Sequence, residues 1–215
     1  MYNIIASGSK GNAIVYHDEI LVDVGVAYKH IEPFLNKIKY ILLTHRHSDN
    51  YKKKIVQRIQ NNYPTIIFIG CQWFEDVENI TIINPNEWYQ LECYQIAIFN
   101  LIHDVENVGY RIFKELPDFE HHKTFHATDM NNLDGIEAVG YDLYMMEQNH
   151  CAIKIDKVIQ EKQDNGVFSH ELYSKLNHMS NQKADDWLDA NNTKGAKVVP
   201  LHISATAGTR GGLDE

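Results

Sequence analysis

Several features that mark other protein classes are scarce or missing in this chain of 215 residues. Its three cysteines, Cys71, Cys93 and Cys151, are widely spaced and form no Cys-x-x-Cys pair, which argues against a disulfide framework and a thiolate zinc site. With only five prolines, a long flexible linker is not expected. No apolar run approaches the roughly 20 residues that cross a bilayer, and the first residues lack the pattern of a signal peptide. We therefore expect a cytoplasmic protein.

Basic residues are also in the minority. Lysine and arginine number 20 against 29 acidic residues, which gives a net charge of −9 and argues against a broad, sequence-blind coating of nucleic acid. Hydrophobic residues make up 44% and charged residues 23%, as in an ordinary globular protein. Histidine, by contrast, is abundant at 12 residues, which indicates a metal site only where the spacing brings imidazoles together.

Hydrophobic periodicity predicts strands that alternate with helices. We expect strands at residues 3–5, 13–16, 20–25, 40–44, 65–70, 81–83, 94–101, 109–113, 124–127, 143–147 and 197–201, and helices at 30–39, 52–60, 153–162 and 180–190. No repeat or low-complexity tract interrupts this order. The alternation, with its β-rich middle, predicts an α/β sandwich in a single domain over residues 1–215.

The sharpest local signal is the segment 44–50, which reads Thr-His-Arg-His-Ser-Asp-Asn. It follows a buried strand and precedes a helix, where a loop projects side chains from a rigid base. His45, His47 and Asp49 alternate, so three potential metal ligands lie within five residues, and imidazole and carboxylate suit Zn²⁺, Mn²⁺ or Fe. The alternative interpretation is a polar surface loop with incidental histidines. We expect His121, His122 and His126 to be solvated.

This segment resembles the metallo-β-lactamase-fold hydrolases, whose signature loop reads Thr-His-x-His-x-Asp-His. Segments 21–25, 102–104, 127–130 and 200–204 resemble further motifs of that family, in the expected order. The resemblance implies a four-layer αββα sandwich and two divalent metal ions, Zn or Mn. It also implies that Asp23 supports the metal loop and that the metal ligands are His45, His47, Asp49, His103, Asp129 and His202.

Shorter segments resemble one branch of this superfamily, the small bacterial YycJ-like 5′-exonucleases, and more distantly ribonuclease Z. They are residues 6–12, 147–150 and 177–181. The resemblance implies two catalytic residues, Asp49 to hold or deprotonate the attacking water and His178, at the start of a helix, to donate a proton to the leaving oxygen. We expect substrate contacts from Ser9, Lys10, Asn12, Asn50, Lys52, His150 and Ser180.

The chain departs from the family pattern at Asn50, where the signature has a histidine that helps to hold the second metal. An amide oxygen is a weak ligand for transition metals. The second site is therefore filled with fewer ligands or with Mn²⁺, or the protein works with one metal, or it has lost catalysis and kept a binding pocket. We favour retained catalysis, because Asp49, Asp129 and His202 are all present.

The predicted function is a metal-dependent phosphodiester hydrolase in which a metal-bound hydroxide attacks phosphorus. Basic residues beside the metal loop, among them Lys10, Arg46 and residues 52–54, would grip phosphates, unless they form only a solvated surface. A nuclease acting on nucleic-acid ends is preferred. The alternatives are a phosphodiesterase for small cyclic nucleotides and a catalytically weakened nucleotide-binding protein, with lactone or thioester hydrolysis less favoured. No membrane partner is expected, and a homodimer is left open.

Overall fold

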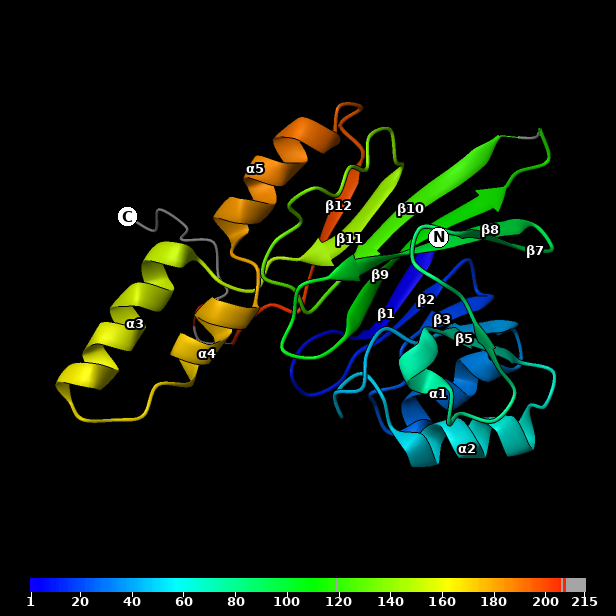
Figure 1. The fold of residues 1–215 in the computed structure, drawn as a ribbon, viewed down its shortest axis with the longest axis horizontal. Helices are drawn as coiled ribbons and strands as arrows, with labels where there is room; N and C mark the ends of the chain where they lie inside the picture. Colours follow the sequence, from blue (N-terminus) through cyan, green and yellow to red (C-terminus); the bar gives the residue numbers. More distant parts are fainter. Residues whose placement is uncertain (119, 206, 208–215) are drawn as a thin grey trace. The chain divides into compact units, whose positions relative to one another are not determined.

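The computed structural model describes residues 1–118, 120–205 and 207 of the chain, and it contains two compact units, Met1–Glu87 and Trp88–Glu215 (Figure 1). We call them unit 1 and unit 2. Each contains one six-stranded mixed sheet together with helices. The predicted α/β class is therefore confirmed. No helix among the described residues is both long and apolar enough to span a bilayer.

Unit 1 is built on a sheet in the order β1-β2-β3-β4-β5-β6. The first three strands pair antiparallel, and β3 to β6 pair parallel. Its elements are β1 (Tyr2–Ala6), β2 (Ala13–Tyr16), β3 (Ile20–Val22), α1 (Tyr28–Leu35), β4 (Tyr40–Leu42), α2 (Lys53–Asn62), β5 (Ile67–Gly70), the 3₁₀ turn η1 (Gln72–Phe74) and β6 (Ile80–Ile82).

The two helices of unit 1 pack on one face of this sheet (Figure 1). Ile31 of α1 and Ile59 of α2 are fully buried in one cluster with Ile41 of β4. Parallel strands need crossover connections, and α1 and α2 supply them between β3 and β4 and between β4 and β5. The carboxyl ends of β3 and β4 thereby lie side by side, and the segment 44–50 follows β4 directly.

Unit 2 repeats the mixed arrangement, in the order β12-β11-β10-β9-β8-β7. Strands β10, β11 and β12 pair parallel, and β7 to β10 pair antiparallel. Its elements are β7 (Trp88–Leu91), β8 (Tyr94–Leu101), β9 (Asn107–Glu115), β10 (His121–Ala127), β11 (Leu143–Glu147), α3 (Ala152–Asp164), α4 (His170–Asn177), α5 (Asn181–Asn191) and β12 (Lys197–Leu201).

Helix α5 covers the parallel part of the unit 2 sheet. Ala184 and Leu188 of α5 are buried in a cluster with Phe125 of β10 and Tyr144 of β11. The indole of Trp187 stacks on Phe125, with ring centroids 5.1 Å apart. Helices α3 and α4 form a hairpin that leads from the end of β11 to the start of α5 (Figure 1).

Three elements were not predicted, namely β7, α4 and the 3₁₀ turn η1, and one predicted helix is shifted. The expected helix at residues 30–39 is α1, which ends at Leu35. Ile38 lies beyond the helix but is still buried. Its apolar side chain continues the helical spacing of the sequence past the true end of α1. The helix predicted at 180–190 is α5, Asn181–Asn191, so this prediction is accurate to one residue. Ser180 is its N-cap, and the Ser180 hydroxyl accepts a hydrogen bond from the Lys183 backbone N–H.

Candidate metal centre

In unit 1, a chain of three residues fixes the first histidine of the metal loop. Asp23 accepts two hydrogen bonds from Thr44, one from the backbone N–H at 2.9 Å and one from the hydroxyl at 2.7 Å. Because the only hydroxyl proton of Thr44 goes to Asp23, Oγ1 is left to accept from Nδ1 of His45, 3.0 Å away. The tautomer of His45 is thereby set, with its lone pair on Nε2, a nitrogen of the kind that binds metals.

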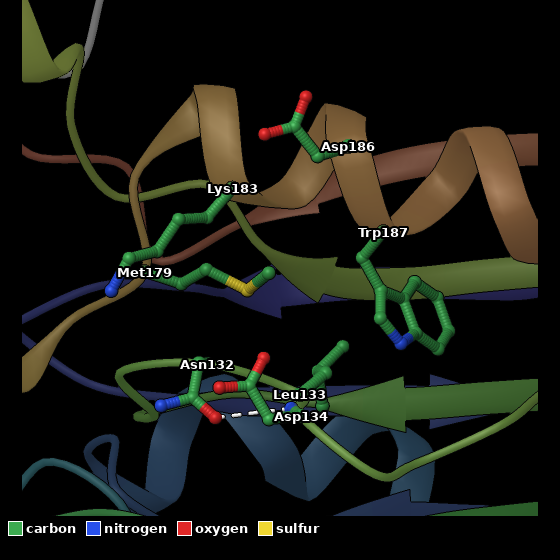
Figure 2. A pocket seen from close by; sticks show the side chains of 7 residues that line it. All are labelled: Asn132, Leu133, Asp134, Met179, Lys183, Asp186 and Trp187. Atoms are coloured by element: carbon green, nitrogen blue, oxygen red, sulfur yellow. Dashed lines mark hydrogen bonds between the residues drawn. The ribbon is translucent and has the colours of Figure 1, made fainter.

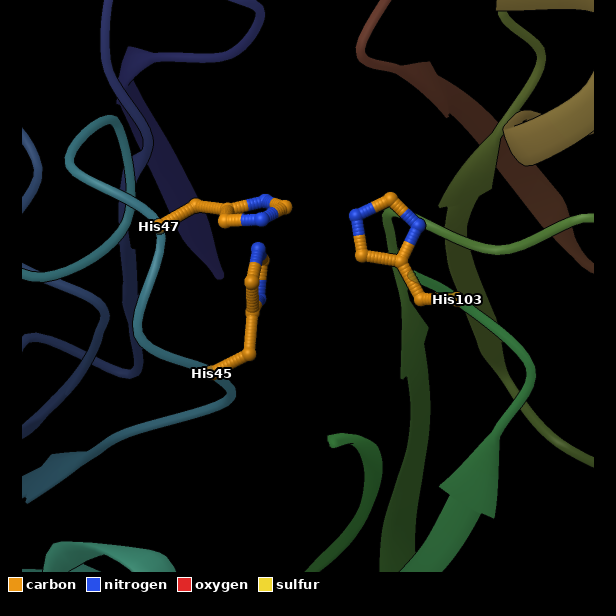
Figure 3. Close-up of side chains that lie close together, drawn as sticks. All are labelled: His45, His47 and His103. Atoms are coloured by element: carbon orange, nitrogen blue, oxygen red, sulfur yellow. The ribbon is translucent and has the colours of Figure 1, made fainter. Parts of the chain in front are cut away.

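Asn50 lies against that same nitrogen. Its Nδ2 is 3.3 Å from Nε2 of His45, and its side chain is fully buried. The ring of His47 meets the ring of His45 edge to face, with centroids 4.8 Å apart (Figure 3). Unit 1 thus presents two imidazoles together, and the amide at position 50 is part of their surroundings.

Backbone contacts hold this loop at Asp49. The Asp49 carbonyl accepts from the backbone N–H of Asn12 at 2.6 Å and from its side-chain amide at 3.3 Å. The side-chain oxygen Oδ1 of Asn12 accepts a hydrogen bond from the backbone N–H of Gly8 at 2.8 Å. A Cβ on Gly25 would lie 1.6 Å from the Asp49 carbonyl oxygen, so the approach of these two segments requires glycine. Asn12 is buried, whereas Ser9 and Lys10 of the same turn are exposed.

In unit 2, two motif residues sit at the ends of parallel strands in a strained backbone conformation. Asp129, after β10, has φ of 56°, and His202, after β12, has φ of 51°, both in the left-handed region. Both are almost fully buried. Nδ1 of His202 lies 2.7 Å from Oδ1 of Asp129. In this conformation the two side chains face each other at the carboxyl ends of the parallel strands.

His178 joins this pair. Its Nδ1 is 3.9 Å from Oδ1 of Asp129, and its ring centroid is 4.9 Å from that of His202. One ligand-type atom from each of Asp129, His178 and His202 lies within 4.8 Å of the others. His178 does not open a helix as predicted. It is the C-cap of α4, in extended backbone, two residues before the N-cap of α5.

Glu147 is the site residue whose role the sequence did not reveal. It ends β11, and its fully buried carboxylate accepts from Nδ1 of His178 at 2.6 Å and from the backbone N–H of Met130 at 2.8 Å. Burial lowers the pKa of His178, but the hydrogen bond and charge of Glu147 outweigh it, so the pKa is raised overall. Glu147 thus ties His178 to the loop that carries Asp129.

His103 follows β8 and lies beside the same group of unit 2. Its ring centroid is 5.5 Å from that of His178, and its Nε2 is 3.1 Å from Oδ1 of Asp104. Figure 3 draws it with the two unit 1 histidines. Within unit 2, four predicted site residues are therefore neighbours, namely His103, Asp129, His178 and His202.

The segment 147–150 acts as a scaffold for these residues. The Asn149 amide donates to the His202 carbonyl at 2.7 Å, and the His150 carbonyl accepts from the backbone N–H of Asn181 at 2.8 Å. His150 is only 2% exposed, and burial, followed by the nearby charges of His178 and Lys183, lowers its pKa to about 4. His150 and Ser180 pair through their backbones. A substrate contact by either side chain stays a prediction.

One expectation about the remaining histidines is wrong. His126 is 2% exposed and not solvated, and it lies in β10 within the predicted strand 124–127. Burial lowers its pKa to about 4, only partly offset by the negative charge of Asp129. His126 is therefore neutral in the folded protein near pH 7.

The basic residues near the metal loop fall into two groups. Arg46 donates to the Trp73 carbonyl at 2.6 Å and pairs with Asp76, to which Lys53 is also close, at 3.6 Å. The guanidinium of Arg58 lies over the ring of Tyr28, 3.6 Å from its centroid. Lys10, Lys52 and Lys54 have no such partner in the described part of the chain. Arg46 is therefore engaged by residues of unit 1, which argues against the predicted phosphate contact by its side chain.

The donor sets in each unit fit divalent transition metals. Unit 1 offers the imidazoles of His45 and His47, and unit 2 offers a carboxylate with imidazoles. Nitrogen and carboxylate donors without thiolates suit Zn²⁺ and Mn²⁺. The residues of the two groups are those that would hold such ions.

Solved structures match the chain over nearly its whole length. The metallo-β-lactamase fold protein YhfI from Bacillus subtilis has a TM-score of 0.66 at 17% identity, over 95% of this chain and 86% of that one. The short form of human tRNase Z has a TM-score of 0.65 at 13% identity, over 94% and 92%. A diphosphatase of the PhnP family has a TM-score of 0.60 at 13% identity, over 96% and 88%.

No protein-family model matches the sequence, and no curated protein matches it. At identities this low, the structural likeness shows the fold alone. The chain has the metallo-β-lactamase fold, and the predicted fold and the resemblance to proteins of that fold are confirmed. The likeness to the YycJ-like branch stays a prediction.

Proposed function

We propose that the chain is a metal-dependent phosphodiester hydrolase that acts on nucleic-acid ends. The observation that carries this proposal is the buried array in unit 2, in which Asp129 faces His202 and His178 while Glu147 holds the far side of His178. The adjacent carboxylate of Asp129 and imidazole of His202 are suited to metal binding. The imidazole of His178, hydrogen-bonded to a carboxylate, is suited to proton transfer. Two proteins of the same fold, a tRNase Z and a diphosphatase, support phosphate esters as the substrate class.

The proposed ligands of two divalent ions, Zn or Mn, are those of the sequence motifs. His45, His47 and His103 are assigned to the first, Asp49 and His202 to the second, and Asp129 to both. When bound, such ions polarise a phosphoryl oxygen and lower the pKa of water toward 7. Because the amide of Asn50 replaces an imidazole, we expect the second ion to bind more weakly than the first.

The chain's own residues then have separate tasks. Glu147 engages Nδ1 of His178, so Nε2 is the nitrogen that hands a proton to the leaving oxygen. Asp49 orients the attacking water by accepting a hydrogen bond from it. The buried surroundings, with Glu147 fully buried and Asp129 2% exposed, limit the water that would compete for these protons.

A short substrate end fits the distribution of charge. Lys10, Lys52 and Lys54 are the lysines near the metal loop that no described residue pairs with, and they suffice for a few phosphates. The net charge of −9 disfavours a long nucleic-acid footprint. This limited number of lysines also favours the second candidate, a phosphodiesterase for small cyclic nucleotides.

A hydrolysis screen with metal analysis tests the proposal. Elemental analysis of the purified protein should find one to two equivalents of divalent metal per chain. Loaded with Mn²⁺ or Zn²⁺, the protein should hydrolyse bis(p-nitrophenyl) phosphate and shorten single-stranded DNA or RNA from an end, and EDTA should abolish both activities. No metal in the protein, and no uptake on addition, would contradict the metalloenzyme.

The same screen separates the alternatives. Hydrolysis of cyclic mononucleotides alone would replace the nuclease by the small-molecule phosphodiesterase. Nucleotide binding without turnover, even with metal added back, would identify a catalytically weakened binding protein, as the replacement at Asn50 allows.

A further inference from the structure

A pocket of about 330 Å³ lies within unit 2, separate from the Asp129, His178 and His202 group (Figure 2). Leu133 and Asp134 form one wall, from the loop after β10. Met179, Lys183, Asp186 and Trp187 form the other, from α5 and the residues just before it. Its volume is in the range of sites for small organic ligands.

Both walls begin at the candidate metal centre. The loop wall continues from Asp129, and the helix wall continues from His178, the two residues whose side chains approach to 3.9 Å. Met179 is adjacent to His178, and Asn132 is three residues beyond Asp129, which an extended chain spans in at most about 11 Å. Along the chain, the pocket lining therefore begins one residue after His178 and three residues after Asp129.

The inner surface of the pocket is apolar and fixed. Leu133 and Met179 are almost fully buried, at 2% and 1% exposure. The indole of Trp187 is held in place by its stacking on Phe125 and by a hydrogen bond from Nε1 to the Ile136 carbonyl at 2.8 Å. A rigid wall of indole, thioether and leucine favours a planar aromatic ring.

The polar groups lie on opposite walls, as Figure 2 shows. Lys183 donates to the side-chain oxygen of Asn131 at 2.9 Å and to its carbonyl at 3.3 Å, which leaves one of its three N–H donors. The Asp134 carboxylate accepts no hydrogen bond from the described residues. The pocket thus offers the Asp134 carboxylate on the loop wall, and the Lys183 ammonium beside the Asp186 carboxylate on the helix wall.

We propose that this pocket binds the guanine base of a nucleotide whose phosphate lies at Asp129 and His178, an inference that rests on the proposed phosphodiester hydrolase. Guanine has two adjacent N–H donors, N1 and N2, for one carboxylate, and the neighbouring O6 accepts from lysine. Adenine lacks the N1–H donor, and inosine, whose base is hypoxanthine, lacks the N2 amine. Asp134 and Lys183 are then specificity-determining residues.

Nucleoside binding tests the pocket without any phosphate. Saturation-transfer NMR titrations of the metal-loaded protein should show that guanosine binds about tenfold more tightly than inosine or adenosine, since a hydrogen bond to a charged group is lost in each. Asp134→Asn should weaken guanosine binding about tenfold and remove its advantage over inosine. Asp189→Asn is the matched control, on an exposed carboxylate of α5 outside the pocket, and should bind guanosine like the wild type.

The outcomes separate this inference from the function on which it rests. Equal affinity for the three nucleosides, or undiminished guanosine binding by Asp134→Asn, overturns the guanine pocket, even in a protein that hydrolyses bis(p-nitrophenyl) phosphate. Selective guanosine binding that depends on Asp134 supports the pocket. If that protein hydrolyses no phosphodiester, the proposed function fails and the pocket stands.

Discussion

At the scale of single residues, the contact between Glu147 and His178 is the one most closely tied to chemistry. The buried carboxylate reaches both His178 Nδ1 and the Met130 backbone N–H, so it orients the imidazole relative to the Asp129 loop. An imidazole without this partner would rotate or change tautomer, and Nε2 would no longer be the proton-donating nitrogen. Glu147 is thus a positioning residue, and His178 is the group that meets the substrate.

We expect Glu147→Gln and His178→Gln each to lower kcat for bis(p-nitrophenyl) phosphate by about 10²-fold or more, with little change in KM. Because the two residues act as a unit, the double variant should be no slower than the slower single variant. Metal content and the urea midpoint are the controls. Multiplicative losses in the double variant would contradict the coupling, since they would mean two independent roles.

Residues also differ in how far the sequence could reveal them. Asp129, His178 and His202 could each be singled out before the structure placed them together, because their segments resemble motifs of metallo-β-lactamase-fold hydrolases. The role of Glu147 depends on a partner 31 positions away, and no local pattern records such a contact. The burial of His126 escaped prediction for a related reason, because the sequence places it in a strand but does not record which distant residues cover its side chain.

At the scale of elements, the metal loop of unit 1 depends on the close approach of the segment after β3. Gly25→Ala would place a Cβ 1.6 Å from the Asp49 carbonyl oxygen and 2.7 Å from the Asn50 backbone nitrogen, so one segment must move. We expect a loss of about 3 kcal/mol in the free energy of unfolding, measured by urea denaturation, together with weaker metal binding.

A second glycine provides the control. Gly195 has φ of +63° but nothing within 4 Å of an added Cβ, so Gly195→Ala should cost about 1 kcal/mol, from backbone strain alone. It should leave metal binding unchanged. A Gly25→Ala protein as stable as Gly195→Ala, with unaltered metal affinity, would show that the loop does not depend on this contact.

The missed elements β7 and α4 both expose most of their apolar side chains, and in β7 only Leu91 is buried. In α4 the buried residue is Glu171, paired with Lys162 at 2.7 Å, while Leu172, Tyr173 and Leu176 are exposed. A helix with this inverted pattern lacks the apolar stripe by which helices are recognised in a sequence. Other strands, such as β2 and β4, are fully buried runs of apolar residues, and these could be predicted.

At the scale of the whole molecule, a net charge of −9 coexists with a few lysines that remain available beside the metal loop. Long-range repulsion opposes a nucleic-acid chain, and only the local lysines attract its end. Each phosphate that a lysine neutralises on a single strand contributes about −0.7 to the slope of log K against log salt. Lys10, Lys52 and Lys54 together therefore predict a slope of about −2.

Fluorescence anisotropy with a labelled single-stranded oligonucleotide, in the His178→Gln background to prevent turnover, measures this slope. Lys52→Gln should make it shallower by about 0.7. Lys53→Gln is the matched control, because Lys53 lies 3.6 Å from Asp76 and is already engaged, so the slope should not change. A slope near −5 would require about seven phosphate contacts. The lysines available at the metal loop do not supply that number, so such a result would replace the short-end substrate by a long nucleic-acid footprint.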